Sequence, residues 1–261
     1  MYETTYVKAT DIDHAAASIG DDGKFLAGGM TLIPTMKQRL ASPEILVDLA
    51  GCGLGAITDE GATIRIGAMA RHGDVAESPL VQAAIPGLAN LAGNIGDRQV
   101  RNRGTIGGSI ANNDPSACYP AAALAMNAII HTNQNDVAAA DFFVGMFETA
   151  LDEDEIIIAV SFPKPHAAAY VKFPNPASRY AMVGVCVAKT DVGVQVAVTG
   201  AGQDGVFRHE GLETALTAHF AADTARGVAI DADELIEDMH GSAAYRAQLI
   251  AEMAARAVAA C

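Results

Sequence analysis

Hydrophobic and polar positions in the first fifty residues predict alternating helices and strands. A helix, a strand, a second helix and a second strand are expected at residues 11–22, 24–29, 31–40 and 44–49. Asp11 and Thr31 have the side chains that cap helix N-termini, and Pro34 falls in a first turn where proline is tolerated. The strand at 24–29 runs into glycines, so the order includes strand, glycine loop, helix, strand.

The pattern changes after residue 51. Apolar and polar residues alternate on both sides of a DEG turn over 56–68, which predicts a hairpin, and Pro79 and Pro86 break a helical pattern at 74–95. A further helix is expected at residues 119–128, and strands are expected at 128–134 and 155–163. Residues 190–204 are expected to form a strand pair, which helices follow within 205–261. We place domain boundaries near residues 55 and 165.

Two short stretches are rich in glycine: AGGMT at 27–31 and GTIGGS at 104–109. A strand that ends in glycines and turns into a helix presents free N–H groups and the positive end of the helix dipole to an anion. The first stretch has this layout, whereas about ten residues separate the second from the next expected helix. We expect positive φ angles at Gly29 and Gly108. Each stretch alone is equally compatible with a tight turn, but together they suggest a pyrophosphate held from two sides.

A third glycine signal competes with these two. GCGLGA at 51–56 formally fits the G-x-G-x-x-A pattern that follows the first strand of a dinucleotide-binding fold. That fold requires a helix to begin within the motif, but a hairpin is expected there instead. The sequence therefore disfavours this alternative.

Composition and charge narrow the classes of function. The 261 residues carry a net charge of −14, which argues against a nucleic-acid-binding protein. No apolar stretch is long enough to span a membrane, and the N-terminus lacks the pattern of a signal peptide, so we expect a cytoplasmic protein. Cys52, Cys118, Cys186 and Cys261 are widely spaced, which disfavours an iron–sulfur cluster or structural zinc site in this chain.

Five segments together resemble the FAD-binding (medium) subunit of the molybdenum hydroxylases, the family of carbon monoxide dehydrogenase and xanthine dehydrogenase. They are FLAGGMTLIPTMKQRL with ILVDL, IRIGAMARHGDVAES, QVRNRGTIGGSIANNDPSACYPAAALAMNA, DFFVGMFETALDEDEIIIAVSFP and FPNPASRYAMVGVCVA. The C-terminal third resembles the family more loosely, through VTGAG and YRAQLIAEMAARAV. The resemblance implies an α+β chain with the PCMH-type (vanillyl-alcohol-oxidase-like) FAD-binding fold. Two α/β subdomains, FAD-binding subdomains 1 and 2, would cover 1–55 and 56–165, and a C-terminal α+β subdomain would cover 166–261.

The resemblance also implies which residues hold FAD. Those expected at the pyrophosphate or beside it are Leu26, Ala27, Gly28, Gly29, Met30, Thr31, Leu32, Thr105, Ile106, Gly107, Gly108 and Ser109. Ile157, Lys172 and Tyr180 match positions near the flavin, although Tyr180 is equally compatible with a packing role. The family usually has an acid where this chain has Cys118, so either Asp114 replaces it or the contact is lost. We expect non-covalent FAD, because neither loop places His or Cys at a family attachment point.

The function that the resemblance implies is electron transfer within a larger enzyme. A 2Fe-2S iron–sulfur subunit would deliver electrons to FAD, a molybdopterin-containing large subunit would oxidise the substrate, and the complex would be a dimer of heterotrimers. NAD, a quinone and oxygen are the alternative acceptors. A self-contained flavin oxidase or reductase and a non-catalytic nucleotide-binding module are the alternative functions. We expect no catalytic side chain and no metal ligand, with His72, His131 and His166 on the surface or in loops.

Overall fold

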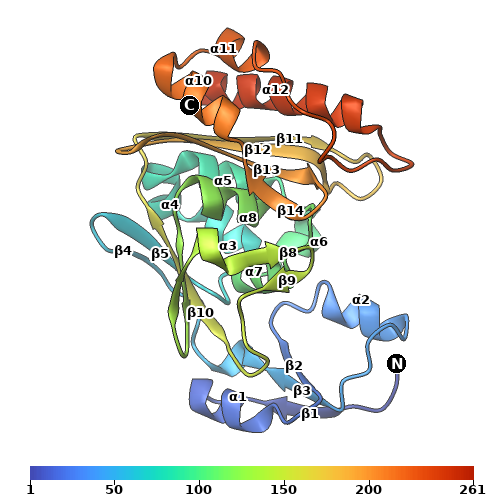
Figure 1. Cartoon of the computed structure of the whole chain (residues 1–261). Helices are drawn as coiled ribbons and strands as arrows, with labels where there is room; N and C mark the ends of the chain where they lie inside the picture. The colour runs from blue at the N-terminus through green and yellow to red at the C-terminus, as the bar shows by residue number, and fades with distance from the viewer.

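The first forty-eight residues form a small parallel sheet with one helix beside it and one beyond its edge (Figure 1). The computed structural model describes all 261 residues. The strands pair in the order β1-β3-β2. The elements of this unit are β1 (Thr5–Lys8), α1 (Ile12–Ser18), β2 (Gly23–Leu26), α2 (Leu32–Lys37), β3 (Ile45–Asp48) and the 3-10 helix η1 (Leu49–Gly51).

An antiparallel sheet of order β4-β5-β10-β6-β7 follows. Its strands are β4 (Ile57–Asp59), β5 (Thr63–Gly67), β6 (Ile129–Thr132), β7 (Asp136–Ala138) and β10 (Ile157–Pro163). Helices inserted between β5 and β6 pack on this sheet: α3 (His72–Glu77), α4 (Pro79–Ala84), α5 (Pro86–Gly93), α6 (Arg98–Arg101), α7 (Ile106–Asn112) and α8 (Cys118–Ala125). A short helix and hairpin complete the unit: α9 (Ala139–Phe142), β8 (Phe143–Gly145) and β9 (Glu148–Thr149).

The last sheet is sandwiched between two layers of helices (Figure 1). It is antiparallel, and its strands are β11 (Ala167–Pro174), β12 (Ala181–Thr190), β13 (Gly193–Gly202) and β14 (Gly205–Arg208). Helices α10 (Glu210–Ala218), α11 (Ala222–Arg226) and α12 (Ala243–Ala260) cover one face, and α5 and α8 lie against the other. None of the helices is long and apolar enough to cross a membrane.

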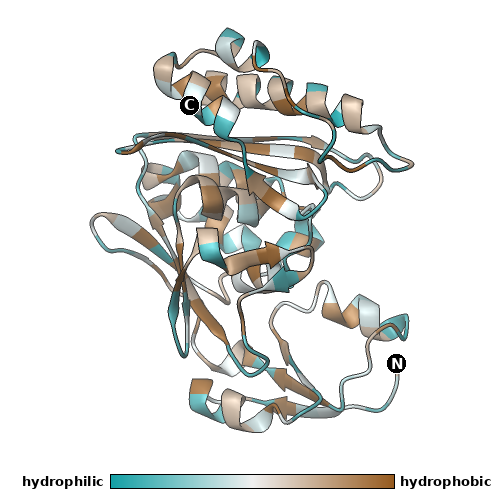
Figure 2. Cartoon of the chain, viewed as in Figure 1, coloured by the Kyte–Doolittle hydropathy of each residue, from teal (hydrophilic) through white to brown (hydrophobic).

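Burial on both faces explains why the strands of this sheet are almost continuously apolar (Figure 2). Alternate residues point to opposite faces of a strand. Val183, Val185 and Val187 join the core beneath α12, whereas Cys186 and Ala188 join the core that contains α5 and α8. The chain therefore has two large cores that share one sheet.

Most of the helices and strands predicted from the sequence are present. The hairpin at β4 and β5 turns at Gly61, whose φ is +82°, and helices end or begin at Pro79 and Pro86 as expected. Asp11 caps α1 by accepting a hydrogen bond from the His14 N–H at 2.8 Å. Thr31 occupies the N-cap position of α2, but its side chain makes no capping hydrogen bond.

Candidate functional site

A cavity of about 660 Å³ is lined by residues of the β2–α2 loop, α7, the start of β10 and the β11–β12 loop. That volume is within the range of small-molecule and cofactor sites, roughly 300–1,000 Å³. All but one of the residues that the sequence assigns to the cofactor line it: Leu26, Ala27, Gly28, Gly29, Met30, Thr31, Leu32, Thr105, Gly107, Gly108, Ser109, Asp114, Cys118, Ile157, Lys172 and Tyr180. The exception is Ile106, whose side chain is buried in the core.

The two glycine segments touch each other at one wall of this cavity. A Cβ on Gly28 would lie 2.0 Å from the carbonyl oxygen of Arg103, just before the second segment. Gly107 packs in the same way on Ala68, where an added Cβ would lie 2.6 Å from the Ala68 Cβ. Gly28 and Gly107 are therefore required because they let two segments of the backbone approach closely. That approach forms the wall.

The first segment carries backbone donors that no other part of the chain uses. The N–H groups of Gly28, Gly29, Met30 and Thr31 donate no hydrogen bond within the chain. Gly29 has a φ of +73°, as expected, which turns the backbone ahead of α2. Successive free N–H groups at a glycine turn form a concave site for an anion. This segment therefore has the donors that a phosphate group requires.

The second segment differs from its prediction because its glycines lie inside a helix. α7 begins at Ile106, and Thr105 caps it by accepting from the Gly108 N–H at 3.1 Å. Gly108 accordingly has no positive φ. The N–H groups of Ile106 and Gly107 donate to the carbonyls of Ala70 and Ala68. This helix was missed in the sequence because Thr105 was not treated as an N-cap. A threonine followed by small or apolar residues is a possible helix start.

Side chains at the far end of the cavity form a polar cluster around Cys118. The Nζ of Lys172 donates to the Arg179 carbonyl oxygen at 2.8 Å and contacts the Cys118 Sγ at 3.6 Å. Asp114 accepts from the Ser116 N–H at 2.8 Å, and burial raises the pKa of its carboxyl. Burial also raises the pKa of Tyr180, with Asp114 and Cys118 adding to the effect. The lining contains three cationic residues, Lys24, Lys172 and Arg179, and two acidic ones, Asp114 and Glu155.

The expectation that His72 and His131 lie on the surface or in loops is wrong. His72 is the first residue of α3, is 5 % exposed and lines the cavity, and burial lowers its pKa to about 4. His131 is in β6, with its side chain 14 % exposed. His166 is on the surface as expected and pairs with Asp191. The sequence pattern missed His72 because a single histidine at a helix start carries no periodic signal.

Other cavity residues were also missed by the sequence analysis. Met69, Phe147, Glu155 and Arg179 line the wall, each from a different segment between elements. Loop positions such as these have no hydrophobic periodicity, so only the folded chain brings them together.

The GCGLGA segment does not form a dinucleotide-binding turn. η1 ends at Gly51, and the chain then enters the β4–β5 hairpin instead of a helix. A Cβ on Gly53 or Gly55 would meet nothing within 4 Å, so neither glycine allows the chain to approach a neighbour closely. This rules out the alternative Rossmann interpretation.

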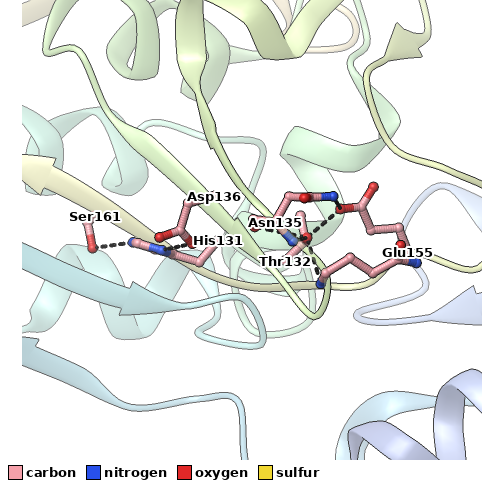
Figure 3. A network of polar contacts seen from close by, with 7 residues as sticks. His131, Thr132, Asn135, Asp136, Glu155 and Ser161 are labelled. Atoms are coloured by element: carbon pink, nitrogen blue, oxygen red, sulfur yellow. Dashed lines mark hydrogen bonds and ion pairs between the residues drawn. The ribbon is translucent and has the colours of Figure 1, made fainter.

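A serine, a histidine and an aspartate meet on the β4-β5-β10-β6-β7 sheet, as Figure 3 shows. The His131 ring lies 2.6 Å from the Asp136 carboxylate and 2.8 Å from the Ser161 Oγ. Ser161 is 6 % exposed within β10, and none of the three lines the cavity. A hydrolytic triad needs an accessible nucleophile and donors for an oxyanion. We therefore assign these contacts to the cohesion of β6, β7 and β10.

The neighbouring polar contacts in Figure 3 fix one edge of the cavity. Glu155 is 6 % exposed, and its carboxylate accepts hydrogen bonds from the Thr132 hydroxyl and the Asp152 N–H. It directly precedes Ile156 and Ile157, which line the cavity. The buried carboxylate thus holds the turn that delivers these two side chains to the wall.

Comparison with known proteins identifies the family. Residues 2–165 match the family described as the FAD binding domain in molybdopterin dehydrogenase. The chain belongs to this family. The carbon monoxide dehydrogenase medium chain of Hydrogenophaga pseudoflava is 36 % identical over 256 residues, covering 92 % of this chain and 89 % of the relative. The nicotine 6-hydroxylase medium subunit of Paenarthrobacter nicotinovorans is 32 % identical, covering 97 % and 95 %.

Solved structures agree with this membership and confirm the expected α+β fold. A carbon monoxide dehydrogenase from Hydrogenophaga pseudoflava, which lacks the Mo-pyranopterin moiety of the molybdenum cofactor, superposes with a TM-score of 0.88 at 35 % identity. The match covers 99 % of this chain and 97 % of the matched dehydrogenase chain. The reconstituted CO dehydrogenase from Oligotropha carboxidovorans gives a TM-score of 0.89 at 30 % identity, covering 99 % and 97 %.

Membership establishes FAD as the cofactor and an oxidoreductase flavoprotein subunit as the class of protein. The residues of the cavity fit that cofactor. Four successive free N–H groups suit the oxygen atoms of a diphosphate, and three cationic side chains suit its charge. The apolar walls supplied by Leu26, Met69 and Ile157 suit an aromatic ring system.

Proposed function

We propose that the cavity holds FAD with its diphosphate beside the two glycine segments. The observation that carries this proposal is the row of unpaired N–H groups from Gly28 to Thr31, in residues that line a cavity in a chain of a FAD-binding family. The hydroxyls of Thr105 and Ser109 lie in the same wall and are available as further donors. Lys24, Lys172 and Arg179 would offset the negative charge of the cofactor.

In this proposal the chain transfers electrons and performs no acid–base step of its own. Bound FAD supplies the redox chemistry, accepting and releasing electrons. The chain excludes water from one side of the cofactor with Leu26, Met69 and Ile157, and leaves the other side accessible near Tyr180. Tyr180 is 46 % exposed, as suits a residue at the opening of the cavity.

We further propose that an iron–sulfur subunit delivers the electrons and that a molybdopterin-containing subunit oxidises the substrate. The support is that relatives covering almost the whole chain are named as medium chains or medium subunits. Each such name implies further subunits in that protein. An external acceptor would then reoxidise the FAD of this chain.

Exposed apolar side chains near the cavity opening support a partner on that side. Val144, Met146 and Phe147, on the β8–β9 hairpin, are 59 %, 49 % and 61 % exposed. Phe147 and Tyr180 also line the cavity. Clustered aromatic residues and methionine at a surface are typical of the core of a protein–protein interface. We assign the iron–sulfur partner to this face.

The division into subdomains 1–55, 56–165 and 166–261 is also our proposal. It is supported by the sheets, because the three main sheets cover residues 5–48, 57–163 and 167–208. The FAD cavity would then receive walls from all three subdomains.

The test is co-expression with candidate partner subunits and purification through a tag on this chain alone. We expect a yellow complex that contains iron–sulfur and molybdopterin subunits. Val144→Asp should reduce the recovery of the partner subunits without loss of flavin. Val192, between β12 and β13, is also an exposed apolar residue, and Val192→Asp should leave the recovery of the partner subunits unchanged. A lone flavin-loaded chain that oxidises an organic substrate would favour a flavin oxidase. A chain that never carries flavin would favour a nucleotide-binding module.

A further inference from the structure

One polar side chain in the cavity wall lacks a partner. His72 is 5 % exposed, and its Nδ1 atom is buried without any hydrogen bond. Buried polar atoms are nearly always hydrogen-bonded, so an exception calls for an explanation. The residue is held firmly by its backbone, because the His72 N–H donates to the Gly104 carbonyl oxygen at 2.9 Å.

The surroundings of His72 determine its protonation state. Burial is the main reason that its pKa falls to about 4, and the nearby positive charge of Arg101 acts in the same direction. The ring is therefore neutral at physiological pH and carries one proton. Its nearest aromatic neighbour is Tyr119, with ring centroids 5.5 Å apart.

The orphaned Nδ1 atom then indicates which nitrogen carries that proton. A buried N–H donor without an acceptor is rarer in folded proteins than an acceptor that lacks a donor. The favoured tautomer consequently leaves Nδ1 unprotonated and places the proton on Nε2. His72 becomes a donor through Nε2 without adding a charge.

Gly104 packs closely against the Nε2 edge of the His72 ring. A Cβ at position 104 would lie only 2.5 Å from the Nε2 atom, so no other residue fits there without moving the ring. Gly104 and His72 both line the cavity, and Gly104 directly precedes the Thr105 cap of α7. This site therefore lies beside the contact between the two glycine segments, where Gly28 meets Arg103.

We propose that His72 is a binding residue for FAD, donating a hydrogen bond from Nε2–H to an oxygen of the cofactor diphosphate. This inference rests on the proposed placement of the diphosphate beside the glycine segments. A neutral donor in this position orients the diphosphate and leaves charge compensation to Lys24, Lys172 and Arg179. It also gives a role to a buried imidazole that makes no side-chain hydrogen bond within the chain.

The test compares ring variants of the full-length chain. His72→Phe keeps the ring and removes both nitrogens, whereas His72→Gln keeps a donor near the Nε2 position. We expect His72→Phe to weaken both FAD and ADP about fivefold to tenfold, as for the loss of one hydrogen bond, and His72→Gln to recover most of the affinity. Tyr119→Phe is the matched control, because Tyr119 is fully buried next to the ring but does not line the cavity.

Nitrogen-15 NMR of the histidine rings in the unmodified chain provides a readout that does not depend on variants folding. We expect the Nε2–H tautomer of His72 without FAD, and a shift of its Nε2 resonance on addition of FAD or ADP. An Nδ1–H tautomer, or unchanged resonances with unchanged affinity in His72→Phe, would overturn the inference. Gly29→Val distinguishes the placement of the diphosphate from the role of His72. If Gly29→Val abolishes FAD binding and His72→Phe does not weaken it, only the role of His72 is wrong. If neither variant affects FAD, the placement of the diphosphate fails and the role of His72 fails with it.

Discussion

Gly28 and Arg103 are in contact through their backbones, although 75 residues separate them in the sequence, and any side chain at position 28 would collide with the Arg103 carbonyl oxygen at 2.0 Å. This contact joins the β2–α2 loop to the segment that precedes α7. The cavity exists because these two segments meet.

Replacing Gly28 by alanine should therefore open the cavity wall. Because the obstructing atom belongs to the backbone, the segments must separate, and we expect loss of FAD together with a destabilisation of about 1–3 kcal/mol. Flavin content and urea unfolding measure the two effects. Gly55→Ala is the control, because a Cβ there meets nothing within 4 Å. Full flavin content in Gly28→Ala would show that the contact is not required.

Gly29→Val and Gly108→Val should both reduce FAD binding, but for different reasons. Gly29 has a φ of +73°, which a β-branched residue adopts only with strain. Gly108 is helical, and its new Cβ would lie 2.9 Å from the Thr105 Oγ1 that caps α7. We expect Gly29→Val to lower thermal stability through backbone strain, by about 1–3 kcal/mol. Gly108→Val should lower it by about 1 kcal/mol through loss of the cap. Circular dichroism melts and flavin content distinguish these outcomes; equal flavin occupancy in both variants and the parent would contradict the assignment.

The FAD-free chain should lose stability as the pH falls below neutrality because of His72. Its pKa in the folded chain is about 4, below the ordinary value of 6.5, so the unfolded chain binds the proton first. The free energy of unfolding should thus decrease between pH 6.5 and pH 4 by about 3 kcal/mol from this group. Urea unfolding at several pH values measures the slope, and His72→Phe should flatten it. An unchanged slope in that variant would assign the acid sensitivity to other groups.

Cys118 and Asp114 test how the polar end of the cavity works. Cys118→Asp places a carboxylate near the Lys172 Nζ, which now lies 3.6 Å from the Sγ, so we expect FAD affinity to be retained or increased. Asp114→Ala should weaken FAD if Asp114 has taken over the role of the family acid. Flavin fluorescence titration measures both. Unchanged affinity in Asp114→Ala would indicate that this contact has been lost in the chain.

FAD should be released by acid precipitation, because we expect non-covalent binding. His72 and Cys118 are the histidine and the cysteine in the cavity wall, and the first is neutral and buried while the second contacts Lys172. Absorption of the supernatant after precipitation measures the released flavin. A yellow pellet would contradict the prediction and would direct peptide mapping to these two residues.

The sequence predicted the local elements well where the signal was local. Helix breaks at Pro79 and Pro86, the turn at Gly61 and the cap at Asp11 depend on neighbouring residues, and all are present. The helix at 106–112 was missed because glycines lower helix propensity, and Thr105 provides the only start signal.

The candidate site was predictable only through the two glycine segments and the family resemblance. Residues such as Glu155 and Arg179 reach the cavity by tertiary contacts, through hydrogen bonds to Thr132 and to the Gly96 carbonyl oxygen. His72 was misplaced for the same reason, since its burial depends on Gly104 and Tyr119, which are distant in the sequence. No periodic pattern encodes such contacts.

The sheet shared by the two cores has a consequence for evolution and for protein engineering. The family match ends at residue 165, yet Tyr170, Cys186, Ala188 and Ala197 from the following strands complete the core that contains α5 and α8. A fragment cut at that boundary would expose the side of α5 and α8 that β11–β13 now covers. The recurring unit in the sequence is thus smaller than the unit that folds, and recombination between relatives must exchange the C-terminal sheet along with it.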